Sequence, residues 1–197
     1  FLKAEKCILG VLGFERVSFR YLRHLDYETG KELTAKEAKR IPSFGLIPMY
    51  IDALLPRVDE RVIGQLGFAP PDEPVLEQIF QEPGSSRTVR ISGHEVRVPE
   101  PAFSLAMKLN SVGNRTMDHK RVKDLCDITV LCLHSGEEMG TLIRRAISIC
   151  DKSKSANASA TEDDIAQVSG TTGIPVQSVN IVLKALGIIS GNAPGKR

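Results

Sequence analysis

The sequence predicts an α+β fold, in which a mixed sheet with flanking helices is followed by a small all-helical C-terminal domain. Two observations support this prediction. Strand-like segments, apolar or alternating, occur around 15–24, 46–55, 87–91 and 94–98. Apolar residues at helical spacing lie between these segments and dominate after residue 99. Together these patterns place a mixed domain first and helices last.

The first 25 residues predict a helix followed by a strand. Residues 1–12 have apolar positions at helical spacing without a cap before them, and Gly13 is a suitable residue to end the helix. A helix entered partway along suggests that the natural protein has residues before Phe1. Residues 14–25 then alternate through Val17, Phe19 and Tyr21, which predicts a strand.

The next segments predict a turn, a short helix, a buried strand and a hairpin. Residues 26–30 read as a turn, and Thr34 with Glu37 forms the pattern of a capping box. The apolar run 46–55 predicts a buried strand that ends at a proline. Residues 87–91 and 94–98 alternate on either side of Ser-Gly, which predicts a hairpin.

The rest of the chain predicts helices at about 99–112, 119–134 and 137–150. Residues 151–160 are rich in Ser, Ala, Lys and Asn and read as a linker. Residues 161–189 form a compact two-helix pattern. The predicted organisation is therefore a larger α+β domain at 1–150, expected to be incomplete at its N-terminus, a linker at 151–160 and a small helical module at 161–197.

The composition is that of a folded globular protein, with 42% hydrophobic and 25% charged residues. A net charge of +2 does not indicate nucleic-acid or membrane binding by the whole chain, so such a site must be a local patch. Apolar stretches such as 47–55 are far shorter than the roughly 20 residues of a membrane span. The four cysteines show neither CxxC pairing nor metal spacing. We expect a soluble cytoplasmic protein with reduced cysteines and no membrane partner.

A cluster of charged residues in the middle of the chain carries the functional prediction. Lys108 and Arg115 lie about two helical turns apart, and Lys123, Asp124 and Asp127 follow on the next helix. Such cations can hold a polyphosphate while the carboxylates orient an attacking hydroxyl. Phosphoryl-type transfer is catalysed mainly by this kind of positioning and charge neutralisation. The open alternative is an ordinary salt-bridged, solvent-exposed helix surface.

The order of these residues resembles the nucleotidyltransferase-like proteins of the abortive-infection type, the AbiEii toxins and their relatives. The likeness covers about 46–134: strand, turn, strand, then Pro-Glu-Pro-Ala-Phe-Ser-Leu-Ala-Met-Lys, an arginine and Lys-Asp-x-x-Asp. It implies a nucleotidyltransferase-like sheet, a nucleoside triphosphate as substrate and Mg²⁺ as cofactor. On this likeness Lys108 and Lys123 bind nucleotide, with Arg115 grouped beside them, and Asp124 and Asp127 serve in catalysis.

Asp52 adds to the resemblance. Nucleotidyltransferase folds carry a carboxylate inside a hydrophobic strand, and Asp52 has that place, which implies that it binds the metal. An isolated acid in an apolar run is costly unless it is paired or binds a cation. The alternative is a structural aspartate at the strand end, bonded to a backbone amide or to an arginine such as Arg57.

The chain also departs from the family pattern. A Gly-Gly turn followed by Asp-x-Asp supplies two metal-binding carboxylates in the family, and the sequence contains neither motif. In the family this signature is N-terminal to everything matched here. Either residues upstream are missing or the chain is a degenerate relative. The residues present are not expected to catalyse metal-dependent transfer by themselves.

The tail, residues 161–189, resembles the helix-turn-helix of winged-helix regulators. Thr161-Glu-Asp-Asp is a capping-box-like start, small residues at Ala166 and Gly170 are expected to let two helices cross closely, and three apolar residues of the second helix are expected to pack. Those three are Val176, Val179 and Leu183. In DNA binding, the contacting residues would be Gln177, Ser178, Asn180 and Lys184. Because that helix has a single cation, a module for packing or self-association is the competing interpretation.

Three functional hypotheses stay open. The first is a nucleotidyltransferase that passes a nucleotide to an acceptor such as RNA or protein. The second is a DNA-binding regulator acting through the tail, and the third is an inactive relative that binds nucleotide without chemistry. The expected partners are a nucleotide, then nucleic acid, and either a second copy of the chain or an antitoxin-like protein.

Overall fold

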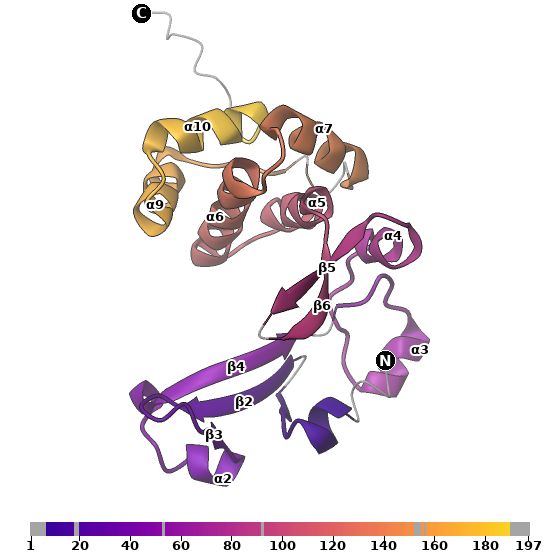
Figure 1. Ribbon diagram of the computed structural model, residues 1–197, viewed down its shortest axis with the longest axis vertical. Helices are drawn as coiled ribbons and strands as arrows, with labels where there is room; N and C mark the ends of the chain where they lie inside the picture. Colours follow the sequence, from indigo (N-terminus) through magenta and orange to yellow (C-terminus); the bar gives the residue numbers. More distant parts are fainter. Residues whose placement is uncertain are drawn as a thin grey trace, which may run out of the picture. The chain divides into compact units, whose positions relative to one another are not determined.

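The computed structural model describes residues 7–17, 20–52, 54–91, 93–151, 155 and 157–189. It confirms the α+β prediction, with antiparallel strands in the first half and helices in the second (Figure 1). The chain divides into two compact units, Phe1–Pro74 and Val75–Arg197. Each unit has its own hydrophobic core.

The first unit contains an antiparallel sheet. Its central strand is β2 (Arg20–Asp26), which pairs with β1 (Glu15–Val17) and β3 (Glu32–Leu33) on one side and with β4 (Leu46–Asp52) on the other. The single strand predicted over 14–25 is therefore two strands, with Val17 opposite Arg20. Apolar alternation continues from one strand into the next, so the pattern alone could not show the reversal. Phe19 lies outside the described residues.

Short-range sequence signals in this unit are confirmed. The turn after β2 is held by Asp26, whose carboxylate accepts from the backbone N–H of Glu28 and Thr29. The capping box of Thr34 and Glu37 starts α2 (Ala35–Ala38). The unit also contains η1 (Cys7–Val11), a π-helical turn that precedes Gly13, then η2 (Ser43–Gly45) and α3 (Glu60–Leu66). The predicted opening helix is confirmed only as this short turn, since residues 1–6 lie outside the described part.

A strand forms within 46–55, at Leu46–Asp52, but the prediction that this strand is buried is wrong. β4 pairs with β2 alone among the described strands, so it forms an edge, and its apolar side chains Ile47, Met49 and Tyr50 are exposed. A continuous apolar run predicts burial on both faces, but an edge strand needs a neighbour to provide it. The small core of this unit is built instead on Phe14 and Tyr21.

The second unit begins with α4 (Val75–Gln81) and a two-stranded ribbon. β5 (Ser86–Ile91) and β6 (His94–Pro99) pair antiparallel, which confirms the predicted hairpin. Gly93 has φ +84°, the left-handed conformation that a tight turn requires of glycine. Among the described residues, five helices follow: α5 (Pro101–Val112), α6 (Asp118–His134), α7 (Met139–Ile149), α9 (Glu162–Thr172) and α10 (Val176–Ala185).

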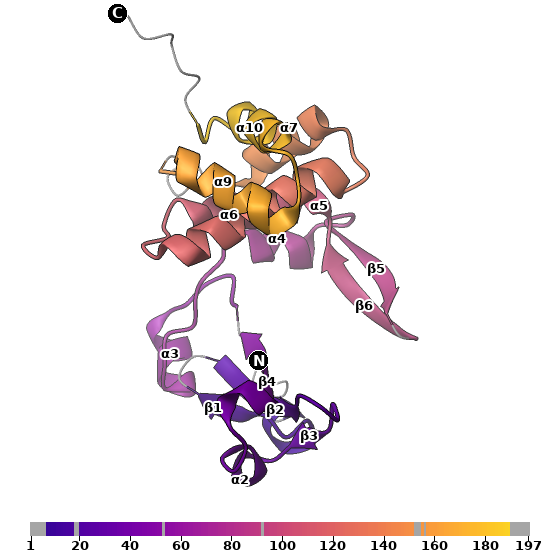
Figure 2. The ribbon, with the colours of Figure 1, turned by 90° about the vertical axis from the view of Figure 1, so that its left-hand side faces the viewer.

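One core joins all the helices of the second unit. It contains Leu105 of α5, Leu125 of α6, Leu142 of α7, Val168 of α9 and Leu183 of α10, all fully buried. Figure 2 shows α9 packed against α6 and α10 beside it. The boundary between compact units thus falls at Pro74, and the predicted linker 151–160 does not coincide with a boundary. A polar composition marks a solvent-exposed connection, but it does not show whether the flanking helices share a core.

The packing of the tail differs in detail from the predicted one. Val179 and Leu183 are buried as predicted, but Val176 is exposed. Ala166 and Gly170 are also exposed, so these small residues do not form the helix crossing. The apolar side chains that α9 buries are Ile165 and Val168, because their spacing of three places them on the same face. Gly173, with φ +71°, ends α9 and starts the turn.

Cys126, Cys132 and Cys150 are free and buried. Burial raises the pKa of the Cys126 thiol, and it raises the pKa of Cys132 to about 12. The side chain of Cys7 lies outside the described part. Among the described residues, no helix combines the length and the apolar character needed to cross a membrane.

Candidate functional site

Two adjacent helices and the loop between them bring the predicted charged residues together. Pro at the first position of α5 and the extended Glu100 before it fix where that helix starts, and its apolar residues anchor it in the core. Lys108 lies on a half-buried side of α5. Asp124 and Asp127 lie on α6, and Arg115 comes from the connecting loop. The packing of α5 on α6 therefore assembles the cluster from residues up to 19 positions apart.

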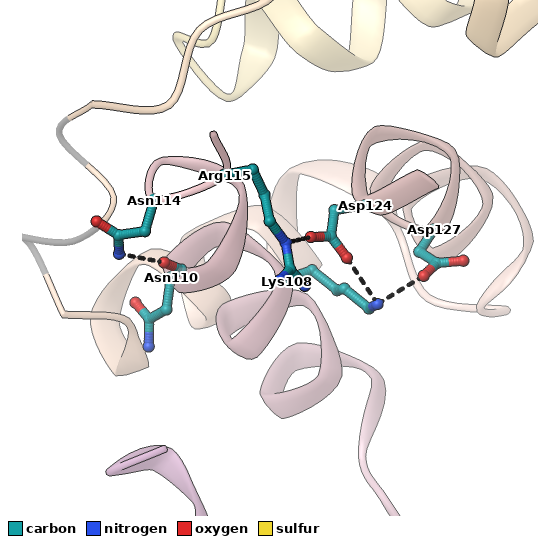
Figure 3. A network of polar contacts seen from close by, with 6 residues as sticks. All are labelled: Lys108, Asn110, Asn114, Arg115, Asp124 and Asp127. Carbon is teal, nitrogen blue, oxygen red and sulfur yellow. Dashed lines mark hydrogen bonds and ion pairs between the residues drawn. The ribbon is translucent and has the colours of Figure 1, made fainter. Parts of the chain in front are cut away.

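The cluster is a chain of four charges (Figure 3). Lys108 Nζ donates to Asp124 Oδ1 at 3.0 Å and to Asp127 Oδ2 at 2.6 Å. Arg115 Nε donates to the other oxygen of Asp124, Oδ2, at 2.6 Å. The structure thus brings together four of the five predicted residues. We call Lys108, Arg115, Asp124 and Asp127 the charged cluster.

Burial separates the two carboxylates of the charged cluster. Only 3% of the Asp124 side chain is exposed, against 40% for Asp127. Each oxygen of Asp124 accepts from a cation, so this buried carboxylate is compensated. Asp127 has one oxygen against Lys108 and a side chain that solvent reaches. Asp124 therefore fixes the two cations, whereas Asp127 is the carboxylate of the cluster that solvent reaches.

The electrostatics of Lys108 follow from the same contacts. The largest single effect on the pKa of Lys108 is burial, which lowers it. The hydrogen bonds from its ammonium to Asp127 and Asp124, with their charges, outweigh that effect and raise the pKa above its ordinary value. Lys108 is therefore a permanent cation at neutral pH. It can attract an anion but cannot act as a base.

Lys123, the fifth predicted residue, is not part of the charged cluster. It is exposed on α6 and forms no ion pair with the described residues. It lies one turn before Asp127, on the same exposed stripe of the helix. A lysine in this place is free to move toward a ligand that approaches Asp127.

Sequence reasoning missed a buried asparagine that supports the loop of the cluster. The side-chain oxygen Oδ1 of Asn110 accepts from the backbone N–H of Asp151 at 2.9 Å. The backbone carbonyl of Asn110 accepts from Asn114 Nδ2 at 3.0 Å. Asn110 is buried, and Asn114 immediately precedes Arg115. The available signal was an amide directly after the apolar Leu109 of α5, since a buried polar side chain must find partners.

A second missed feature joins α6 to the tail. Arg121 donates to Asp164 at 2.9 Å and also pairs with Asp118 at 3.0 Å. Asp164 is buried and completes the capping box of α9 with Thr161. Burial favours a higher pKa for Asp164, but the bonds from Thr161 and Arg121 outweigh it and lower that pKa. The tail is thus fixed to the helix that carries Asp124 and Asp127.

Asp52 belongs to the first unit, where it pairs with an arginine. Arg20, opposite it in the sheet, approaches Asp52 Oδ1 to 3.0 Å, and the guanidinium also lies over the ring of Tyr50. The arginine that the alternative required is therefore Arg20 and not Arg57. The Asp52 side chain is 46% exposed, so it is not an isolated charge in an apolar interior.

Asp52 and the two aspartates of the charged cluster do not by themselves fit a Mg²⁺ ion. Mg²⁺ prefers several oxygen ligands, commonly one or two carboxylates with waters and phosphates. Asp52 faces a guanidinium that would repel a cation. Within the described ranges, no group of three or more His, Cys, Asp or Glu side chains is arranged to hold a metal.

A comparison of the chain with protein-family models, with curated proteins and with solved structures found no match.

The predicted DNA-contacting residues lie on α10 with different exposures. Gln177 and Lys184 are exposed, whereas Ser178 and Asn180 are half-buried. Asn180 Nδ2 donates to the carbonyl of Val176 one turn earlier, so its amide is engaged within the helix. The outer face of α10 also exposes Ile181, and its inner face packs in the core.

A cavity of about 260 Å³ opens in the first unit. Its wall includes Leu22, Leu33 and Leu46, with Glu15 and His24 among the polar residues. None of the predicted site residues lines it. The cavity is therefore not part of the charged cluster.

Proposed function

We propose that the chain is a nucleotidyltransferase-like protein whose second unit binds the phosphates of a nucleoside triphosphate at the charged cluster. The observation that carries the proposal is the bond of Lys108 to both a buried and an exposed carboxylate of the neighbouring helix. A surface ion pair made only for stability has no need of a buried anchor. Here the anchor holds two cations at a place that solvent reaches.

The residues have distinct roles in this proposal. Asp124 is a positioning residue, which holds Lys108 and Arg115 by its two oxygens. An arriving phosphate replaces Asp127 as a partner of Lys108, and Lys123 adds a second lysine from one turn away. Asp127 is then free to accept a hydrogen bond from an acceptor hydroxyl. Such positioning with charge neutralisation is the main source of catalysis in phosphoryl-type transfer.

The donor set described above does not fit Mg²⁺, so no step is assigned to the metal. Metal-dependent transfer needs further carboxylates beside Asp52. Binding of the triphosphate needs only the cations of the charged cluster. We therefore propose nucleotide binding by this chain. Nucleotide transfer and a cytoplasmic location are further parts of the proposal.

Equilibrium binding of fluorescent GTP and ATP analogues tests the proposal. We expect Lys108→Gln to weaken binding about tenfold or more, because it removes the cation that both aspartates hold. Arg145→Gln is the matched control, since Arg145 pairs with Glu137 on the surface of α7 at 2.7 Å. This control loses an ion pair and one positive charge without touching the charged cluster.

The outcomes separate the hypotheses. Equal binding by the wild type, Lys108→Gln and Arg145→Gln would show that the charged cluster is structural. Binding that depends on Lys108, without any transfer when Mg²⁺ and RNA are supplied, identifies a catalytically inactive nucleotide-binding chain. Binding with transfer identifies the transferase.

DNA binding by the tail is a second candidate function. It is supported by the outward placement of Gln177 and Lys184 on a helix whose other face is buried. Salt-dependent retention on duplex DNA that Gln177→Ala/Asn180→Ala abolishes would support it. Unchanged retention of this double variant would leave α10 as a packing helix.

A further inference from the structure

The ribbon of β5 and β6 carries more positively than negatively charged side chains. Residues 86–99 contain Arg87, Arg90 and Arg97 and a single carboxylate, Glu95. The formal net charge of the ribbon is therefore +2, which equals the net charge of the whole chain. All three arginines are exposed. The ribbon is therefore a local positive patch.

The pairing register places arginines on both faces of the ribbon. Arg97 is opposite Thr88 and Arg90 is opposite Glu95, so these arginines share one face. Arg87 is opposite Val98, on the other face. Figures 1 and 2 both show the ribbon extending from the helices of its unit at the start of α5. Both faces are therefore open within that unit.

The arginines of the ribbon form no ion pair with a described residue, although Glu95 lies across from Arg90. Arg97 donates through Nε and Nη2 to the hydroxyl of Ser86, a neutral acceptor. An isolated two-stranded hairpin is marginally stable in water, so a partner that covers it would also stabilise it.

We infer that this ribbon binds the phosphate backbone of duplex DNA by entering the major groove. That groove is about 12 Å wide and admits a two-stranded ribbon, with a row of phosphates on either side. Arginines on both faces match two rows of phosphates, whereas an acidic protein surface would engage one face. The major groove of A-form RNA is narrow, and single strands are usually held by aromatic stacking, for which the ribbon has no Phe, Tyr or Trp.

This inference does not depend on nucleotide binding at the charged cluster or on α10. Fluorescence anisotropy of a labelled DNA duplex, measured from about 50 to 200 mM salt, gives the affinity and its salt slope. For Arg87→Gln/Arg90→Gln we expect affinity at least about tenfold weaker at low salt. The plot of log K against log salt should be shallower by about 2, one for each lost phosphate contact.

Three further variants separate a ribbon contact from a general charge effect and from a contact through α10. Arg57→Gln/Arg61→Gln removes two exposed arginines of the first unit and gives the same net charge, so it should keep the slope of the wild type. Arg87→Lys/Arg90→Lys keeps the charge and should keep most of the slope. Gln177→Ala/Asn180→Ala should leave the slope unchanged, since it removes no cation.

Three results would overturn the inference. One is a wild-type chain that is not retained by duplex DNA at low salt. Another is an equal loss of slope in the ribbon variant and in Arg57→Gln/Arg61→Gln. The third is equal or tighter binding of an RNA duplex or of single strands, which would assign the ribbon to a different nucleic acid.

Discussion

Lys108 and Asp124 form an ion pair across two helices, with Nζ 3.0 Å from Oδ1. The lysine side chain is one-third exposed, whereas the aspartate is almost completely buried. A buried carboxylate is tolerated only when cations or hydrogen bonds compensate it, and here Arg115 supplies the second cation. The pair therefore contributes both to the stability of the unit and to the placement of a surface cation.

The first prediction concerns the two aspartates of the charged cluster. Asp124→Asn should lower the free energy of unfolding by about 2 kcal/mol, because Lys108 and Arg115 lose a buried charge partner but stay partly solvated. Asp127→Asn should cost less than about 1 kcal/mol, since that side chain is 40% exposed. Urea unfolding of the two variants measures the difference. Equal costs would show that burial does not distinguish the aspartates.

The second prediction concerns the bond between α6 and the tail. The pKa of Asp164 is lowered from 3.8, so its stabilisation is present above that pH and is lost as the pH falls through its folded-state pKa. Asp164→Asn should therefore be less stable than the wild type at about pH 6. The gap should shrink toward about pH 2 as the wild-type carboxylate is protonated. Urea unfolding across this range measures the gap, and a constant gap would contradict the assignment.

Local sequence signals predicted much of the fold because their physics is local. The capping box of Thr34 and the glycine turn of the ribbon depend on residues within a few positions, and both are confirmed. Whether β4 is buried, and where the chain divides into compact units, depend on which segments pack together although they are far apart in the sequence. An apolar run such as 46–55 cannot show whether a neighbouring strand covers it. The same limit explains why the polar segment 151–160 did not mark the boundary.

The charged cluster was predictable for a related reason. Asp124 and Asp127 share one helix, so their spacing defines their faces, and the order of Lys108 and Arg115 places these cations nearby. Their burial was not predictable, because it depends on how α5 packs on α6. The salt partner of Asp52 was missed for the same reason. Arg20 is 32 residues away and meets Asp52 only through the register of β2 and β4.

The third prediction uses cysteine reactivity to test the core of the second unit. The pKa of Cys132 is raised to about 12 by burial, so it is protonated at neutral pH. We expect Cys132 to stay unmodified by a thiol-specific reagent in the folded chain and to react once urea unfolds it. Peptide mass spectrometry resolves the individual cysteines. Fast labelling of Cys132 under native conditions would contradict the burial of this face of α6.

The fourth prediction asks whether the tail unfolds with the rest of its unit. Leu183 is fully buried in a core shared with α5 and α6, whereas Ile181 on the same helix is 57% exposed. Leu183→Ala should cost about 2–5 kcal/mol, and Ile181→Ala should cost under about 1 kcal/mol. Both replace a large aliphatic side chain with alanine in α10, so the difference isolates burial.

The number of transitions in the urea unfolding curve shows whether the tail unfolds together with the second unit or separately from it. If α9 and α10 share the core, Leu183→Ala moves one cooperative transition of the second unit to lower urea, and probes of α6 and of the tail move together. A tail that were a separate module would give an early transition of its own and leave the transition of α6 unchanged. Hydrogen exchange of α6 amides at moderate urea distinguishes these cases, because an intact α6 stays protected. We expect α6 to lose protection along with the tail, since Arg121 and the shared core join them.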